Sequence, residues 1–196
     1  PRVIIFFVDG LSVKVLNELR SAGQVPNIEQ YLYRRGLAIE SAITCMPSIT
    51  YAATATMSTG LLPGHHDILG NKWFDRNSLI VRDYSYIRTY QLLDADLRAA
   101  TMYELLDDRL TVTIQTANRL GADRPYDNWM SSGISWFFGD LHGVDKLIPL
   151  RFGEIARCAN LYGRWPDLIM AYMPAVDEIG HRYGADSPEY RAAIVN

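Results

Sequence analysis

Two short apolar runs constrain the fold of this chain more than any other feature. Arg2–Val8 reads RVIIFFV and Asp167–Tyr172 reads DLIMAY, and neither shows the polar–apolar alternation of a half-buried strand. Continuous runs of this length, rich in β-branched and large apolar residues, are typical of strands buried on both faces, as in a parallel sheet. We therefore expect the chain to be built on a parallel sheet that is covered on both sides.

Helical patterns lie between and after these runs. Ser12 can cap a helix that ends near Gly23, and Ser187-Pro188 can open another near the C-terminal end. The other expected elements are helices over Pro26–Tyr33, Thr50–Ser58, Thr101–Leu110 and Leu147–Leu161, and strands over Leu37–Thr44 and Thr111–Thr116. This alternation predicts the α/β class, here a three-layer α/β/α sandwich with a mostly parallel central sheet.

The composition is that of a globular domain. Of the 196 residues, 48% are hydrophobic and 21% are charged, and the net charge of -3 offers no basic surplus for a nucleic-acid polymer. No apolar run reaches the roughly 18–20 residues that span a bilayer, so no transmembrane segment is expected. Cys45 and Cys158 can pair or stay free, and we expect two free, packed thiols. The oligomeric state stays open.

Two aromatic-rich stretches fit the alternation poorly. Residues 71–90 and 123–143 carry most of the tryptophans and many tyrosines, with weak periodicity. Long loops in compact domains are often functional. We expect both stretches to be insertions or loops over the C-terminal edge of the sheet.

The first candidate functional residue is Asp9, which directly follows the N-terminal apolar run. Parallel sheets bind ligands beyond the carboxyl ends of their strands, although an Asp-Gly pair is also a common turn. The second is Thr50, where the helix over Thr50–Ser58 begins. A hydroxyl at a helix N-terminus lies in a positive field that suits a phosphoryl group, and a plain helix cap is the alternative.

A third candidate is the pair Asp177 and His181, which follows the second apolar run. Residues at i and i+4 share one face of a helix, so this pair can bind one cation. Imidazole with carboxylate suits zinc or manganese better than calcium. The alternative is a surface aspartate with a capping histidine. Adjacent side chains diverge, so we do not expect His65 and His66 to bind a metal together.

The order and spacing of these motifs resemble the alkaline phosphatase superfamily, above all its type I phosphodiesterase / nucleotide pyrophosphatase family. The resemblance rests on V-D-G at 8–10, P-N-I at 26–28, P-S-I-T-Y at 47–51, S-T-G-L-L-P-G-H-H-D-I-L-G-N at 58–71 and D-E-I-G-H-R-Y-G at 177–184. It covers residues 3–10, 26–36, 45–75 and 167–184, whereas residues 76–166 match no pattern of the family.

The resemblance implies a role for each matching position. Asp9 corresponds to a ligand of the first metal ion, and Thr50 to the nucleophile, which also contacts metal. Asp177 and His181 correspond to two ligands of the second ion. Tyr51 corresponds to an aromatic residue that stacks on the base of a nucleotide substrate, and His66 to a histidine that we expect to be structural.

The implied activity is that of a metal-dependent phosphoric ester hydrolase acting through a phospho-threonine intermediate. Two divalent ions, zinc or manganese, activate the threonine hydroxyl and hold the phosphoryl oxygens. No organic cofactor is implied. The implied partner is a small-molecule phosphoester, with a nucleotide as one option.

Two departures leave the substrate class open. The nucleotide pyrophosphatase pattern has a lysine before the nucleophile and an asparagine three residues after it, where this chain has Ile49 and Ala53. Phosphomonoesterase, phosphonate hydrolase and phosphomutase of the same superfamily are therefore alternatives. A non-catalytic member that binds a ligand or partner is an alternative of another class.

The family completes its two metal sites with an S-D-H-G block and one further histidine, all downstream of the D-x-x-G-H motif. His181 is the last histidine of this chain. We therefore expect residues 1–196 to be the N-terminal portion of one phosphodiesterase/phosphatase catalytic domain, which alone binds metal weakly and turns over no substrate. The resemblance favours a periplasmic or extracellular location, and no signal peptide is visible in the sequence.

Overall fold

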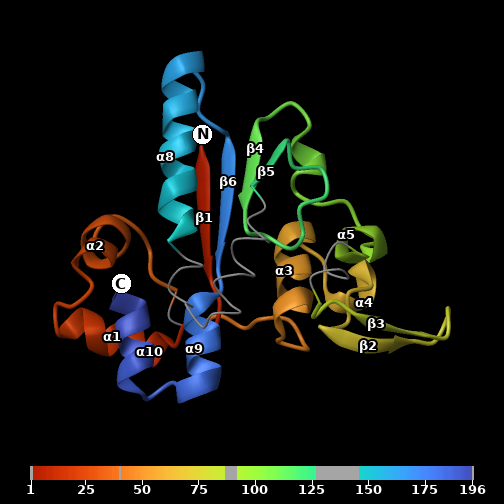
Figure 1. Ribbon diagram of the computed structural model, residues 1–196, viewed down its shortest axis with the longest axis horizontal. Helices are drawn as coiled ribbons and strands as arrows, with labels where there is room; N and C mark the ends of the chain where they lie inside the picture. The colour runs from red at the N-terminus through yellow and green to blue at the C-terminus, as the bar shows by residue number, and fades with distance from the viewer. Residues whose placement is uncertain (1, 40, 87–91, 127–145, 196) are drawn as a thin grey trace.

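A four-stranded parallel sheet forms the centre of the molecule (Figure 1). The computed structural model describes residues 2–39, 41–86, 92–126 and 146–195. The strands are β1 (Val3–Val8), β4 (Thr111–Ile114), β5 (Arg124–Tyr126) and β6 (Leu168–Met173), in the order β1-β6-β4-β5. All three pairings are parallel, and β1 pairs with β6 from Val3–Leu168 to Val8–Met173. The predicted α/β class with a mostly parallel sheet is confirmed.

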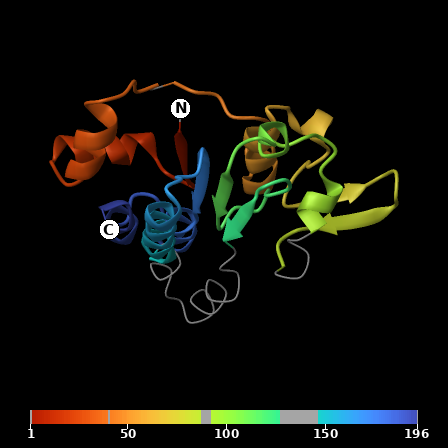
Figure 2. The ribbon, with the colours of Figure 1, turned by 90° about the horizontal axis from the view of Figure 1, so that it is seen from above.

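Helices cover both faces of the sheet (Figure 2). On one face, α8 (Leu147–Tyr162) buries Ile148 and Ile155 against β4 and β6. On the other, Met57 of α3 (Thr50–Thr59) packs near Tyr103 and Met170. Leu168 and Met170 face α3 while Ile169 and Ala171 face α8, so β6 is buried on both sides as expected.

The first strand departs from the expectation of burial on both faces. Val3, Ile4 and Phe6 keep about half of their surface exposed, at 48%, 51% and 49%. β1 is the edge strand of the described sheet, and β6 is its only partner among the described strands. On the α8 side, the Phe6 ring contacts Phe152 with ring centroids 5.7 Å apart.

The remaining elements surround the sheet. They are α1 (Val13–Ser21), α2 (Pro26–Ile28), the π-helical turn η1 (Glu29–Tyr33), α4 (Pro63–His66), β2 (Lys72–Asp75), β3 (Ile80–Asp83), α5 (Leu92–Asp96), the 3-10 turn η2 (Glu104–Leu106), α9 (Ala175–Tyr183) and α10 (Pro188–Val195). Ser12 caps α1 as expected, its hydroxyl accepting the Val15 N–H at 3.4 Å. Both cysteines are free, as expected. No helix in the described ranges has the length and apolar character needed to cross a membrane.

Two predicted elements are wrong. Residues 37–39 and 41–44 are not a strand, because they pair with no described strand and leave Leu37 and Ile43 almost fully exposed. The helix expected over Thr101–Leu110 is reduced to η2. Thr101 and Glu104 cap each other's backbone N–H groups, but the chain then turns at Asp107 after inserting Tyr103 into the core.

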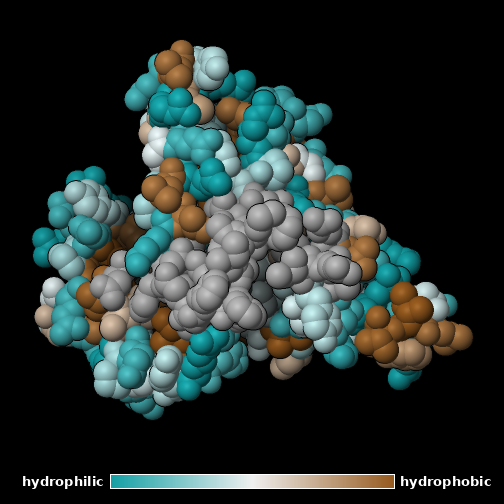
Figure 3. All heavy atoms as spheres, in the orientation of Figure 1, coloured by the Kyte–Doolittle hydropathy of each residue, from teal (hydrophilic) through white to brown (hydrophobic). Residues whose placement is uncertain are grey.

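The two aromatic-rich stretches take different structures. Within 71–90, β2 and β3 form an antiparallel hairpin, with Lys72 opposite Asp83 and Asp75 opposite Ile80. Its outer part exposes apolar side chains, seen at the right of Figure 3: Phe74, Leu79, Ile80 and Val81. Within 123–143, residues 124–126 form β5 of the central sheet and are not a loop, while 127–143 lie outside the described residues.

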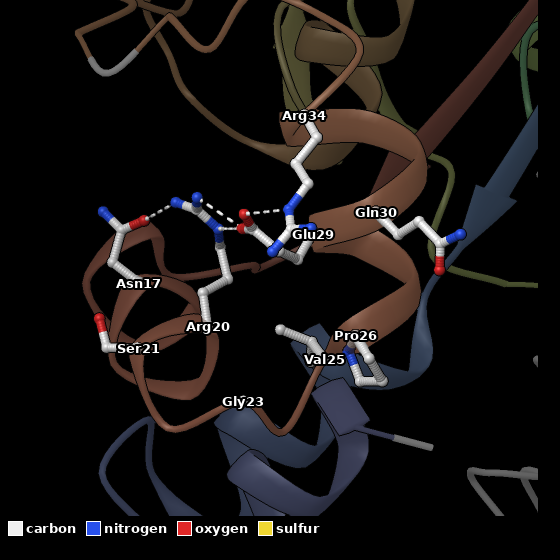
Figure 4. Close-up of a pocket in the computed structure, with 9 residues that line it drawn as sticks. All are labelled: Asn17, Arg20, Ser21, Gly23, Val25, Pro26, Glu29, Gln30 and Arg34. Atoms are coloured by element: carbon white, nitrogen blue, oxygen red, sulfur yellow. Dashed lines mark hydrogen bonds and ion pairs between the residues drawn. The ribbon is translucent and has the colours of Figure 1, made fainter.

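A charged cluster ties α1 to the turn that follows it (Figure 4). The Arg20 guanidinium donates to Glu29 Oε2 at 2.9 and 3.1 Å and lies 3.2 Å above the centre of the Tyr33 ring. Arg34 donates to the other oxygen of Glu29 at 3.4 Å. The hydrogen bond from Arg20 lowers the pKa of the Glu29 carboxyl. The cluster fixes the position of η1 and lines a polar pocket at the surface.

Candidate active site

The carboxyl end of β1 and the N-terminus of α3 bring Asp9 and Thr50 together. The Asp9 N–H continues the sheet ladder by donating to the Met173 carbonyl at 3.1 Å. The Thr50 hydroxyl donates to Asp9 Oδ2 at 3.1 Å, although the two residues are 41 positions apart. The Tyr172 hydroxyl donates to the same oxygen at 2.7 Å. Asp9 is therefore held from two sides, and Thr50 is one of its partners.

Tyr172 reaches Asp9 because it lies at the end of the neighbouring strand. It pairs with Phe7 across β1 and β6, and the two rings stack with centroids 5.6 Å apart. Burial, followed by the negative charge of Asp9, raises the pKa of the Tyr172 hydroxyl far above its ordinary value. The hydroxyl thus stays protonated and acts as a fixed donor to the carboxylate.

The N-terminus of α3 is prepared for an anionic group. Ile49 precedes Thr50 in an extended conformation and provides no side-chain cap. The first N–H groups of a helix lack partners within the helix and carry a partial positive charge. One of them, that of Tyr51, donates to Asn71 Oδ1 at 3.1 Å. Asn71 therefore contacts the first turn of α3, directly after Thr50.

Asn71 is the site residue that the sequence interpretation missed. It lies 20 residues after Tyr51, just before β2, and its backbone carbonyl accepts the Tyr84 N–H at 2.9 Å. The hairpin therefore fixes its position. The motif at 58–71 ends on this asparagine, but nothing in the sequence pattern predicted its contact with α3.

Asp177 and His181 lie on one face of α9, as their spacing predicted. His181 Nε2 and Asp177 Oδ2 are 3.4 Å apart. Burial, followed by the negative charge of Asp9, raises the pKa of the Asp177 carboxyl. Two carboxylates from separate elements thus repel each other across the site, and a cation between them would relieve this repulsion.

Gly10 makes this approach sterically feasible. Its φ of +66° lies in the left-handed region, and a Cβ at this position would come within 2.6 Å of the Asp177 Cα. No side chain fits in that space. The backbone after β1 therefore touches the helix that carries Asp177 and His181.

The donors form two pairs. Asp9 and Thr50 contribute a carboxylate and a hydroxyl, and Asp177 and His181 contribute a carboxylate and an imidazole. The chemistry of this set fits zinc or manganese. Within residues 2–39, 41–86, 92–126 and 146–195, no three His, Cys, Asp or Glu side chains converge on one point. Each pair thus offers two of the three or four protein ligands that zinc sites usually have.

Tyr51 follows Thr50 in the chain, and its ring packs against a neighbouring tyrosine. Its ring meets that of Tyr84 edge-on, with centroids 6.1 Å apart and an angle of 88°. Burial is the main cause that raises the pKa of its hydroxyl. The role of Tyr51 in stacking on a base stays a prediction.

His66 is structural in its packing, as expected. It is fully buried, and its Nδ1 accepts the Ile68 N–H at 3.1 Å. The ring proton therefore lies on Nε2, which is 3.0 Å from the Thr56 hydroxyl. His66 thus joins α3 to the loop after α4. His65 beside it is exposed.

We expect His66→Ala to lower the free energy of unfolding by about 3 kcal/mol, because it leaves a cavity and an unpaired buried N–H. Burial lowers the pKa of His66. As the pH falls, the unfolded state therefore binds a proton on this histidine before the folded state does. This part of the stability of the wild type is present above about pH 6.5 and is lost as the pH falls, so the penalty should shrink towards pH 5. Urea unfolding at both pH values measures this. His65→Ala is the matched control and should change stability by under about 0.5 kcal/mol.

The comparison with known families is decisive. The sequence profile of the type I phosphodiesterase / nucleotide pyrophosphatase family matches residues 3–196. The chain belongs to this family. An uncharacterized pyrophosphatase/phosphodiesterase of Schizosaccharomyces pombe is 27% identical over 195 residues, which are 98% of this chain and 38% of the relative.

Solved structures of type I phosphodiesterases and related proteins share the fold. Murine ectonucleotide pyrophosphatase/phosphodiesterase 5 matches 100% of this chain and 49% of its own, with a TM-score of 0.70 and 19% identity. It is also known as an inactive threonine-to-alanine variant in complex with AMP. Phosphonoacetate hydrolase of Sinorhizobium meliloti matches 99% of this chain and 50% of its own, with a TM-score of 0.59 and 16% identity. This chain spans half or less of the length of these relatives.

Proposed function

We propose that this protein is a metal-dependent phosphoric ester hydrolase of the phosphodiesterase / nucleotide pyrophosphatase type, with Thr50 as its nucleophile. The observation that carries the proposal is the hydrogen bond of 3.1 Å between the Thr50 hydroxyl and Asp9 at the N-terminus of α3, in a chain of this family. A hydroxyl that donates to a carboxylate, beside helix N–H groups, is arranged to attack a phosphoryl group.

Asp9 and Thr50 would hold one divalent cation, and Asp177 with His181 a second. Zinc or manganese in these places would neutralise phosphoryl charge and lower the pKa of a bound hydroxyl. The Tyr172 hydroxyl orients the Asp9 carboxylate by donating to its Oδ2 at 2.7 Å.

Each group of the candidate site has its own role in the proposed reaction. Thr50 Oγ1 forms a bond to phosphorus as the bond to the leaving oxygen breaks. The hydroxyl proton passes to Asp9 Oδ2, and the leaving group departs into solvent, where its oxygen takes up a proton. The N–H groups at the start of α3 that have no partner within the helix donate to the nonbridging oxygens, where negative charge develops. Water then hydrolyses the phospho-threonine in a second displacement and restores the hydroxyl.

A nucleotide-like diester is the substrate class that we favour. Tyr51 lies directly beside the nucleophile, where its ring can meet a base, and the murine relative forms a complex with AMP. A phosphonate is the second candidate, because phosphonoacetate hydrolase shares the fold.

The test is hydrolysis by the purified full-length protein before and after chelation, because residues 1–196 alone are expected to turn over no substrate. We expect bis-p-nitrophenyl phosphate hydrolysis to fall at least about tenfold in chelator and to return with zinc or manganese, with less recovery in calcium because an imidazole is among the donors. Parallel assays with p-nitrophenyl phosphate and a phosphonate rank the substrate classes. Hydrolysis that survives complete removal of metal would contradict the proposal.

A further inference from the structure

Tyr190 of α10 contacts the two backbone segments that carry the candidate ligands, the turn after Asp9 and α9. It is buried, with 1% of its surface exposed, and belongs to the apolar cluster formed with α1 and α9. Its hydroxyl donates to the Gly10 carbonyl at 2.5 Å and accepts the Ser12 N–H at 2.8 Å. One hydroxyl thus bridges the turn that directly follows Asp9.

The ring of Tyr190 rests on the other half of the site. A Cβ on Gly180 would lie 3.2 and 3.3 Å from two of its ring carbons, closer than nearly all real contacts of this kind. Gly180 directly precedes His181 on α9, and because it has no side chain the ring packs directly against the backbone of α9.

The backbone geometry of this turn explains why it depends on Tyr190. Gly10 has a positive φ of 66°, and its Cα faces the backbone of Asp177. The Gly10 carbonyl and the Ser12 N–H take their partner from Tyr190, 180 and 178 positions away, rather than from the turn itself. The orientation of Asp9 relative to α9 thus depends on a residue from the last helix.

We propose that Tyr190 is a positioning residue for the candidate site. Its hydroxyl fixes the turn after Asp9, and its ring fixes the position of α9, which carries Asp177 and His181. The inference rests on the proposed function, because the groups that Tyr190 positions are the metal ligands proposed there. Tyr190 touches none of these carboxylate or imidazole groups in the described contacts and so acts through the backbone.

A purely structural role would need the ring but not the hydroxyl. Burial of the ring against Val15, Leu19 and Val176 explains why an aromatic residue stands here, and phenylalanine would serve that purpose. Tyr190→Phe therefore isolates the hydroxyl. Gly180→Ala is the complementary variant, because it keeps the hydroxyl, displaces the ring and favours the helix by up to about 1 kcal/mol.

The experiment is a zinc titration of the metal-free full-length protein as wild type, both variants and Tyr183→Phe, with hydrogen exchange of the Ser12 amide measured in parallel. Tyr183 is the matched control because it ends α9 and is 57% exposed. We expect Tyr190→Phe and Gly180→Ala to weaken zinc binding about tenfold, the lower range for groups that orient ligands. Exchange at Ser12 should accelerate in Tyr190→Phe, and Tyr183→Phe should match the wild type in both measurements.

The outcomes separate the two proposals. If the wild type binds zinc and Tyr190→Phe binds it equally well, with only a lower melting temperature, Tyr190 is structural and the inference fails while the proposed function stands. If the wild type itself binds neither zinc nor manganese, the proposed function fails and the positioning role fails with it. Unchanged exchange at Ser12 in Tyr190→Phe would show that the hydroxyl does not hold the turn.

Discussion

Replacing Thr50 by alanine is expected to lower the turnover of any phosphoester that the protein hydrolyses by at least about a thousandfold. In the proposed mechanism, the substitution removes the one oxygen that forms the bond to phosphorus in the first displacement. The N–H groups at the start of α3 would still be available to bind substrate, since they do not depend on the hydroxyl. The loss should therefore fall on kcat far more than on KM.

The fold should survive this change. Thr50 is only half-buried and makes one side-chain hydrogen bond, to Asp9, so its loss should cost about 1 kcal/mol. A melting curve checks this separately from activity. A variant that unfolds would carry no information on the nucleophile, and Thr50→Ser guards against that case because it keeps the oxygen.

Two controls define the interpretation. Thr50→Ser should retain activity within about tenfold, and Ser48→Ala, which removes an exposed hydroxyl two residues earlier, should behave as the wild type. Mass spectrometry of acid-quenched reactions should find a phosphorylated peptide containing Thr50 in the wild type and none in Thr50→Ala. Full activity in Thr50→Ala would mean that another group attacks phosphorus.

The parts of this site that sequence reasoning reached are those fixed by local patterns. Asp9 follows a run whose apolar residues demand a strand, and the carboxyl end of a parallel strand is a defined place in the fold. Asp177 and His181 needed only the helical period to be paired. The contact between Asp9 and Thr50 has no local signal, and only the resemblance to a family connected the two residues.

The parts that it missed are set by tertiary contacts. Leu37–Thr44 alternates like a strand, yet a strand needs a partner, and the described chain around it offers none. β1 was expected to be buried on both faces, but burial depends on its neighbours in the sheet rather than on its own residues. Tyr190 reads as an ordinary apolar position of a short helix until the structure places its hydroxyl 2.5 Å from the Gly10 carbonyl.

Gly10→Ala is expected to lower the free energy of unfolding by about 4 kcal/mol. Two costs combine. An alanine at a φ of +66° pays about 1–2 kcal/mol for the left-handed conformation. The new Cβ would also lie 2.6 Å from the Asp177 Cα, and because this neighbour is backbone, no rotamer change relieves the clash.

Gly23→Ala separates these two costs. Gly23 has nearly the same φ, +69°, but nothing lies within 4 Å of a Cβ at that position, so this variant should lose only the conformational part. The difference between the two variants, measured by urea unfolding of metal-free protein, is thus the steric cost of fitting the new Cβ between the turn after Asp9 and α9. If Gly10→Ala still folds, α9 must have moved away from the end of β1, and zinc binding should then be weaker than in Gly23→Ala. Equal stability losses in the two variants would show that Asp177 does not approach Gly10 this closely, and that the two donor pairs are not held together by this contact.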